Sequence, residues 1–412
     1  MGEISNDAVI LGFLMVILGF VFITSSSENK FWKKFYGVVP ALLMCYFLPS
    51  LLPTFGLIDP SKSKLYFVAS RYLLPASLVL FTLSVDLKEI IKLGPKALIM
   101  FLTGTIGIVL GGPIAILIFS VIAPEVVTAA PPNEVWRGMT TIAGSWIGGG
   151  ANQAAMKEVF EVNGDLFSKM VAVDIIVGNT WLGVLLAGVG FSKYLDHKLK
   201  ADTSAIESLK LKMDTYQRSI ARMPTLTDIM KILMVAFGCT GLAHFMSDWI
   251  APFLETNFPI LAEYSLTSGF FWLVVIATSL GVALSFTRAR SLEGAGASRI
   301  GSAFLYVLVA VIGMNMNILS IFENPGLFLV GITWMLFHIL LLIIVAKLIK
   351  APYFFVGIGS TANVGGAASA PIIAAAFHPS LAPVGVLLAV FGYVLGTYGA
   401  YLCGLLMQAV SP

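Results

Sequence analysis

One acidic side chain, Asp174, stands deep inside an apolar stretch of the sequence, residues 170–179. A carboxylate within an apolar membrane helix is costly unless it faces a cavity or a partner, and such residues commonly mark ion or substrate pathways. Asp174 could bind Na⁺ directly or exchange a proton, whereas the structural alternative is an ion pair with Arg71 or Arg299. We favour the functional role, and we include Asn179, which lies about one helical turn further along a nearby face.

Two glycine-rich segments with polar side chains form the second signal, residues 144–156 (GSWIGGGANQAAM) and 359–371 (GSTANVGGAASAP). Glycine in a helix interior costs about 1 kcal/mol relative to alanine, and buried Asn or Gln amides need partners. Such interruptions, in corresponding positions of two halves, point to discontinuous helices at a transporter's central site. There, freed carbonyls can hold Na⁺ and half-helix N-termini can hold an anionic group. The alternative is a small-residue packing face between helices.

These two segments supply most of the candidate ion- and substrate-binding residues. The candidates are Ser145, Gly149, Gly150, Asn152, Gln153, Ser360, Thr361, Asn363 and Ser369, together with Asp174 and Asn179. The sodium candidates among them are Asn152, Gln153, Asp174, Thr361 and Asn363.

The composition of the chain indicates a membrane protein. Hydrophobic residues make up 58% of the 412 residues and charged residues 11%, whereas soluble domains carry about 25% charged residues. Mean hydropathy is +0.92. Apolar stretches of about 20 residues recur along the chain, and each can cross the bilayer as a helix. We therefore expect an all-α, multi-pass protein in contact with the lipid bilayer, in a prokaryotic plasma membrane.

The hydropathy pattern predicts twelve spans. They are residues 8–25, 36–54, 65–86, 96–122, 139–160, 166–190, 226–252, 266–287, 300–321, 326–349, 354–377 and 382–408. The acidic N-terminus lacks the basic start of a signal peptide, so the first span is expected to be retained. The sequence has no P-loop, nucleophile elbow or zinc-binding motif, which argues against an enzyme, a bound cofactor and ATP-driven transport. The basic residues lie in loops, not in a nucleic-acid-binding patch.

A charged linker, residues 191–225, divides the chain into two halves, 1–190 and 226–412. The halves share motifs in the same order, since the two glycine-rich segments align and Gly178 pairs with Gly396. This order predicts an internal repeat, which is inverted if the halves cross the membrane in opposite directions.

Within the linker, apolar residues recur at spacings of three and four, which is typical of a heptad seam. The seam comprises Ile206, Leu209, Met213, Tyr216, Ile220 and Met223. It predicts either a homodimer contact or a helix docked on its own membrane domain, and the sequence leaves both open.

At the glycine-rich segments and Asp174, the chain resembles the YjcL-like family of uncharacterised bacterial integral membrane proteins, over nearly its whole length. Through that family it looks like the superfamily of bile-acid:sodium symporters, sodium–glutamate symporters and cation–proton antiporters. The resemblance implies inverted repeats with broken helices crossing near the midplane, and it implicates Asn152 and Gln153 as ion ligands. Asp174 is similar in position to the acidic residue of the antiporters, although Val173 before it is apolar. Residues 360–363 lack the acidic residue that the bile-acid symporters carry.

Three functional hypotheses follow from these observations. The first, which we favour, is a sodium-coupled symporter of a small, anionic organic solute, because candidate oxygens occur in both interrupted segments. The second is a sodium–proton antiporter in which Asp174 alternates between proton and cation. The third is a membrane scaffold or receptor that acts through the linker helix.

Overall fold

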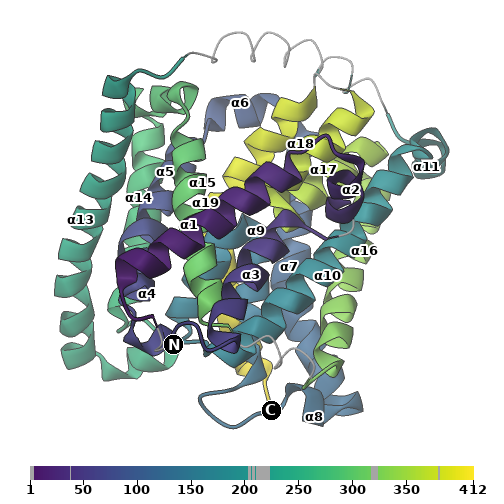
Figure 1. Ribbon diagram of the computed structural model, residues 1–412. Helices are drawn as coiled ribbons and strands as arrows, with labels where there is room; N and C mark the ends of the chain where they lie inside the picture. Colours follow the sequence, from purple (N-terminus) through teal and green to yellow (C-terminus); the bar gives the residue numbers. More distant parts are fainter. Residues whose placement is uncertain are drawn as a thin grey trace.

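The structure is a computed structural model that describes residues 4–37, 39–202, 206, 209, 223–316, 323–378 and 381–412 (Figure 1). Within these residues, eight helices are long and apolar enough to cross a membrane, or up to ten if two bent helix pairs each count as one span. The protein is therefore a multi-pass, all-helical membrane protein. The predicted total of twelve spans is higher than the number that the described part of the chain contains.

The eight candidate spans occur along the whole chain. They are α1 (Asp7–Ser25), the continuous run of α4, η2 and α5 (Leu65–Leu83), α7 (Pro95–Ile122), α10 (Gly164–Val189), α13 (Leu226–Asn257), α15 (Ala297–Met314), α16 (Gly326–Leu348) and α19 (Ala382–Val410). The bent pairs are α2 (Lys30–Tyr36) with α3 (Ala41–Thr54), and α14 (Gly269–Ser285) with η4 (Arg288–Ala295). Shorter helices include α6 (Leu87–Lys92), α8 (Pro124–Val127) and α11 (Ser192–Leu199).

The helices pack as two bundles that share a long interface. In the side bundle, α5, α13, α14 and α15 pack against one another, and α1 and α3 pack on α15. In the hairpin bundle, α7, α10, α16 and α19 surround three further helices, α9 (Val135–Val159), α17 (Tyr353–Val364) and α18 (Gly366–Phe377). Figure 1 shows α13, α14, α5 and α15 together on one side, and α10 and α16 on the other. Both predicted halves contribute helices to both bundles.

Helix α9 is a re-entrant hairpin rather than a crossing helix. Its backbone reverses at Gly149, which has φ 74° and ψ −173°, a conformation that side chains with a Cβ rarely adopt. The Trp136 ring then meets the Phe160 ring at 5.8 Å, and Arg137 Nη1 donates to Phe160 O at 3.3 Å. A straight helix would separate positions 136 and 160 by about 36 Å. The interruption predicted here is confirmed, but the prediction that the segment crosses the membrane is wrong.

The second glycine-rich segment folds back in the same way. The chain turns between α17 and α18 at Gly365 and Gly366, the latter with φ 55°. The ring of Phe354, at the start of α17, packs against Phe377, at the end of α18, with centroids 5.3 Å apart. We call α9 hairpin 1 and the α17–α18 pair hairpin 2. The two arms of such a hairpin enter and leave the membrane on the same side. Hydropathy records only the length of an apolar segment, so the pattern counted each hairpin as one span.

The two hairpins open at opposite ends of α10. Helix α10 begins just after hairpin 1, where the Asn163 side chain accepts a hydrogen bond from Leu166 N. At the other end of α10, Leu185 O accepts from Tyr353 OH at 3.1 Å, and Asp196 accepts from Tyr353 N at 2.7 Å. Tyr353 is the first residue of hairpin 2, so the glycine tips of the two hairpins point toward each other along α10.

The predicted heptad seam of the linker lies mostly outside the described residues. Only Ile206, Leu209 and Met223 of that seam are described, so the dimer contact and the docked helix both stay predictions.

Candidate functional site

A cavity of about 410 Å³ lies where the two hairpin tips meet. Hairpin 1, α10 and hairpin 2 line most of it, and Tyr306 of α15 and residues 40–42 at the start of α3 complete it from the side bundle. The predicted site residues that line this cavity are Ser145, Gly149, Gly150, Asp174, Asn179, Thr361 and Ser369. The structure therefore brings predicted residues of both halves to one place between the bundles.

Among the described residues that line the cavity, Asp174 provides the only carboxylate, and none of them is Lys, Arg or His. Its side chain is 7% exposed. Asp174 Oδ2 accepts hydrogen bonds from Ser145 Oγ at 2.7 Å and from Gln153 Nε2 at 2.8 Å. Arg71, one of its predicted ion-pair partners, instead lies 3.8 Å from Glu158. Two hydrogen bonds to one oxygen leave Oδ1 as the atom with capacity for a ligand.

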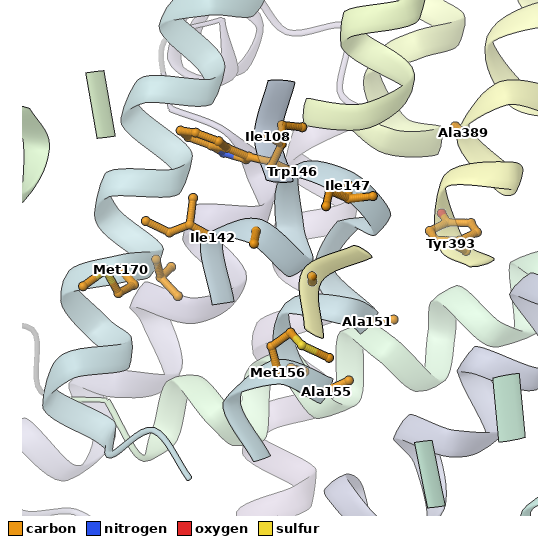
Figure 2. Packing of buried hydrophobic residues seen from close by; sticks show 14 of the residues in the cluster. Ile108, Ile142, Trp146, Ile147, Ala151, Ala155, Met156, Met170, Ala389 and Tyr393 are labelled. Carbon is orange, nitrogen blue, oxygen red and sulfur yellow. The ribbon is translucent and has the colours of Figure 1, made fainter. Parts of the chain in front are cut away.

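The indole of Trp146 lies beside this carboxylate at the tip of hairpin 1. Figure 2 shows Trp146 and Ile147 at the turn, with Ile142 on one arm and Ala151 on the other. Trp146 is fully buried, and its Nε1 has no hydrogen-bond partner within the described residues. A methyl group added to Gly178 would lie 3.7 Å from Trp146 Nε1 and 4.0 Å from Asp174 Oδ1. Gly178 thus leaves room for a methyl-sized group at contact distance from this donor and this acceptor, and 3.5 Å from Val364 Cγ1.

Gln153 connects Asp174 to the side bundle. Its Oε1 accepts a hydrogen bond from Tyr46 OH, on α3, at 3.3 Å, while its Nε2 donates to Asp174. Gln153 and Tyr46 are each 1% exposed. Sequence reasoning missed Tyr46, because a tyrosine in an apolar span carries no sign of which helix it will face.

Asn152 and Asn363 each bind three protein groups and lie outside the lining of the cavity. Asn152 Nδ2 donates to Gly148 O at 3.0 Å and to Tyr393 O at 3.1 Å, and Oδ1 accepts from Thr397 at 2.7 Å. This amide therefore joins the tip of hairpin 1 to α19.

Asn363 repeats the pattern on a different helix. Its Nδ2 donates to Gly359 O at 2.8 Å and to Phe101 O at 2.9 Å, and its Oδ1 accepts from Thr105 at 2.8 Å. Each amide thus bonds the carbonyl four residues before it and two groups, one turn apart, on a neighbouring helix. Their role as sodium ligands stays a prediction, and both oxygens already have a protein donor.

Ser360 belongs to a separate buried chain of hydrogen bonds. Its Oγ accepts from Trp181 Nε1 at 2.8 Å and lies 2.8 Å from His338 Nε2. His338 Nδ1 is 3.0 Å from Gly104 O, which can only accept. His338 therefore carries its proton on Nδ1, and Ser360 donates to Nε2. This chain ties hairpin 2 to α10, α16 and α7.

A cluster of charged side chains joins the two bundles near the open end of hairpin 1. Tyr66 of α4 (Leu65–Val68) donates to Glu158, and Lys157 donates to Tyr66. The side chains of Lys157 and Glu158 are each 12% exposed, and Arg71 of η2 (Ala69–Leu73) reaches Glu158. Within the described residues, no group of His, Cys, Asp and Glu has the arrangement of a metal centre.

The comparisons with known proteins agree with a membrane protein of this size. The chain is 27% identical, over 350 residues, to the uncharacterised membrane protein YjcL of Bacillus subtilis (strain 168). That alignment covers 82% of this chain and 83% of the relative. A family model described as a protein of unknown function (DUF819) matches residues 12–410. The chain therefore belongs to the DUF819 family.

Proposed function

We propose that the protein is a secondary active transporter that carries a small organic solute, coupled to Na⁺, through the cavity between the hairpin tips. One observation carries the proposal: two re-entrant hairpins open at opposite ends of α10, and their tips line a cavity that holds Asp174. Polar, non-helical backbone at membrane depth is tolerated where it lines a cavity, and interrupted helices mark the central sites of transporters.

The cavity offers ligands for a cation and for a polar solute. Asp174 supplies the negative charge, and Ser145 and Thr361 supply hydroxyl oxygens. The first arm of each hairpin ends at the tip, and the carbonyl end of a helix favours a cation such as Na⁺. The second arm starts there with free amides, which favour an anionic group. A volume of about 410 Å³ lies within the range of sites for small molecules.

The arrangement of helices is compatible with an inverted repeat. In the first half, α7, hairpin 1 and α10 follow one another, and in the second half α16, hairpin 2 and α19 do. Because hairpins 1 and 2 open at opposite ends, the two groups of three would cross the membrane in opposite directions.

Alternating access would come from movement of the hairpin bundle against the side bundle. The cavity lies at their interface, since residues 40–42 and Tyr306 of the side bundle form part of its wall. The polar cluster of Lys157, Glu158 and Tyr66 joins the bundles at the end where hairpin 1 opens. In this arrangement that cluster would close the path on its side of the membrane.

A sodium–proton antiporter is the second candidate, because in the described lining of the cavity Asp174 is the only carboxylate and no basic side chain accompanies it. One carboxylate that alternates between a proton and Na⁺ satisfies that mechanism without an organic solute. The scaffold or receptor hypothesis predicts that Asp174 can be replaced without a phenotype.

The test uses the full-length protein, purified and reconstituted into vesicles. We expect NaCl to raise the melting temperature relative to choline chloride, because a ligand that binds only the folded state stabilises it. A metabolite screen by the same readout identifies the solute. Asp174→Asn should abolish the sodium response, whereas Asp165→Asn, an exposed carboxylate in the first turn of the same helix, should keep it.

Uptake of the identified solute that ignores the sodium gradient would refute coupling by symport. Sodium-evoked proton movement that disappears in Asp174→Asn would select the antiporter. A protein whose melting temperature responds to neither ion nor solute would refute both.

A further inference from the structure

Tyr46 reaches the candidate ion site from the other bundle. It lies on α3 of the side bundle, and its hydroxyl donates to Gln153 Oε1 of hairpin 1 at 3.3 Å. Gln153 Nε2 donates in turn to Asp174 Oδ2 at 2.8 Å. Tyr46, Gln153 and Asp174 therefore form one continuous chain of hydrogen bonds from the side bundle to the carboxylate.

The first link of this chain determines which end of the Gln153 amide faces Asp174. An amide has one accepting and one donating end, and a carboxylate can only accept. With Tyr46 OH donating to Oε1, Nε2 faces Asp174 and supports the charged carboxylate. Without that donor, Oε1 would be buried without a partner, which is unfavourable, and the amide would lose the contact that orients it.

Tyr46 is fixed to the side bundle by close backbone packing. A methyl group added to Gly313 of α15 would lie 2.4 Å from Tyr46 O and 2.9 Å from Tyr46 Cα. Gly313 thus lets α15 approach the backbone of Tyr46 directly. Gln153 and Asp174 belong to the hairpin bundle, so movement between the bundles changes the distance from Tyr46 to Gln153.

We propose that Tyr46 is a positioning residue through which the side bundle sets the sodium affinity of Asp174. This inference rests on the proposed function. When the bundles lie as they do here, Gln153 donates to Asp174, and the ionised carboxylate that Na⁺ requires is supported. When the two bundles separate, Gln153 loses its orienting partner. Asp174 then releases Na⁺ or exchanges Na⁺ for a proton. Tyr46 touches neither ion nor solute and acts through Gln153.

The titratable groups near Asp174 are few. Tyr46 of α3 and Tyr306 of α15 approach from the side bundle, and the lining residues of α9, α10, α17 and α18 add none besides Asp174 itself. His338 of α16 is bonded to Ser360 and Gly104 instead. A change in the competition between sodium and protons therefore reports on Asp174.

The test measures the melting temperature of the purified full-length protein against NaCl, with choline chloride at constant ionic strength. The series is repeated at several values between about pH 5.5 and pH 8.5, so that the proton concentration varies about 1,000-fold. In Tyr46→Phe, we expect the half-maximal NaCl concentration to rise by roughly 3- to 10-fold, which corresponds to the free energy that one hydrogen bond contributes. The rise should be larger at acid pH, because Na⁺ then competes with more protons for a carboxylate that has lost the support of a hydrogen-bond donor.

A double-mutant cycle separates positioning from packing. Once Gln153→Ala has removed the link, adding Tyr46→Phe should cause no further loss of sodium affinity, because both changes break one chain. Phe167→Leu is the packing control: the Phe167 ring lies 6.3 Å from that of Tyr46 and is buried. This variant should melt earlier but keep the wild-type sodium and pH response.

Three results would overturn the inference: a wild-type sodium response in Tyr46→Phe, additive losses in the double variant, or the same change in Phe167→Leu. If these occur while wild-type protein responds to sodium and Asp174→Asn does not, only the role of Tyr46 is refuted. If wild-type protein does not respond to sodium, or Asp174→Asn responds equally, the proposed function falls and the inference falls with it.

Discussion

Gly396 of α19 marks a close backbone approach between hairpin 1 and a membrane span, so Gly396→Ala tests the fold directly. A Cβ at this position would lie 2.5 Å from Gly148 Cα, 2.6 Å from Asn152 Nδ2 and 2.8 Å from Asn152 Cγ. The first of these atoms belongs to the backbone at the tip of hairpin 1 and cannot rotate away. The added methyl must therefore push hairpin 1 from α19.

The expected cost follows from the two consequences of that displacement. Overpacking a well-packed interior typically costs about 1–3 kcal/mol. A shift of Asn152 also strains its bonds to Tyr393 O and Thr397 Oγ1, each worth about 0.5–1.5 kcal/mol. A better helix former at an interior position returns at most about 1 kcal/mol. We therefore expect a net loss of roughly 2–4 kcal/mol in the free energy of unfolding.

The measurement is the melting temperature of the full-length protein in detergent, with Gly183→Ala as the matched control. Gly183 also lies inside a membrane helix, α10, but a Cβ there meets nothing within 4 Å. Gly183→Ala should leave the melting temperature unchanged or slightly raised, whereas Gly396→Ala should lower it by several degrees and weaken the sodium response. Equal melting temperatures for the two variants would refute the packing of hairpin 1 on α19.

Three further predictions concern other parts of the structure. Asn152→Ala and Asn363→Ala should each lower the melting temperature, because each removes three buried hydrogen bonds, two of them to a neighbouring helix; an unchanged melting temperature would refute the structural role of these amides. Glu158→Gln should ease separation of the bundles, seen as faster proteolysis together with weaker sodium affinity, because separation breaks the contact of Tyr46 with Gln153; wild-type proteolysis would contradict it. In intact cells, Lys198→Cys should be protected from a membrane-impermeant maleimide, whereas Glu125→Cys should react. The opposite result would place position 198 outside the cell and position 125 in the cytoplasm.

The orientation of the protein in the membrane follows from the positive-inside rule. The rule requires the number of crossings, and that number depends on the two hairpins not being spans. Most basic residues gather at the end where hairpin 2 opens, together with α2, α6 and α11 (Figure 1). They are Lys30, Lys33, Lys34, Lys88, Lys92, Lys96, Lys193, Lys198, Lys200, Arg288, Arg290, Lys347 and Lys350. The positive-inside rule assigns this end to the cytoplasm. The loops that carry these residues all lie on one side of the membrane when the two hairpins do not cross it and each bent pair counts as one span.

Much of the candidate site could be predicted because it depends on residue types that are costly in lipid. A carboxylate at position 174 and glycine runs at 148–150 and 365–366 need a compensating structure wherever the helices pack. The hairpins could not be predicted, because φ at Gly149 and Gly366 depends on tertiary contacts. A glycine permits a reversal as readily as a kink. The sequence therefore located both turns without specifying their angle.

The polar residues of hairpin 1 show how a ligand candidate can be separated from a packing residue. Asn152 donates to Gly148 on its own arm and bonds two groups on α19, so its amide is hydrogen-bonded to protein groups at both ends. Gln153, the next residue, has one methylene more and projects from another face, where its partners are Asp174 and Tyr46. Its amide is thus committed to the carboxylate and to the side bundle. The two adjacent amides therefore differ in role although their chemistry is similar. Because of their partners, replacing Asn152 should alter mainly stability, and replacing Gln153 should alter the sodium response.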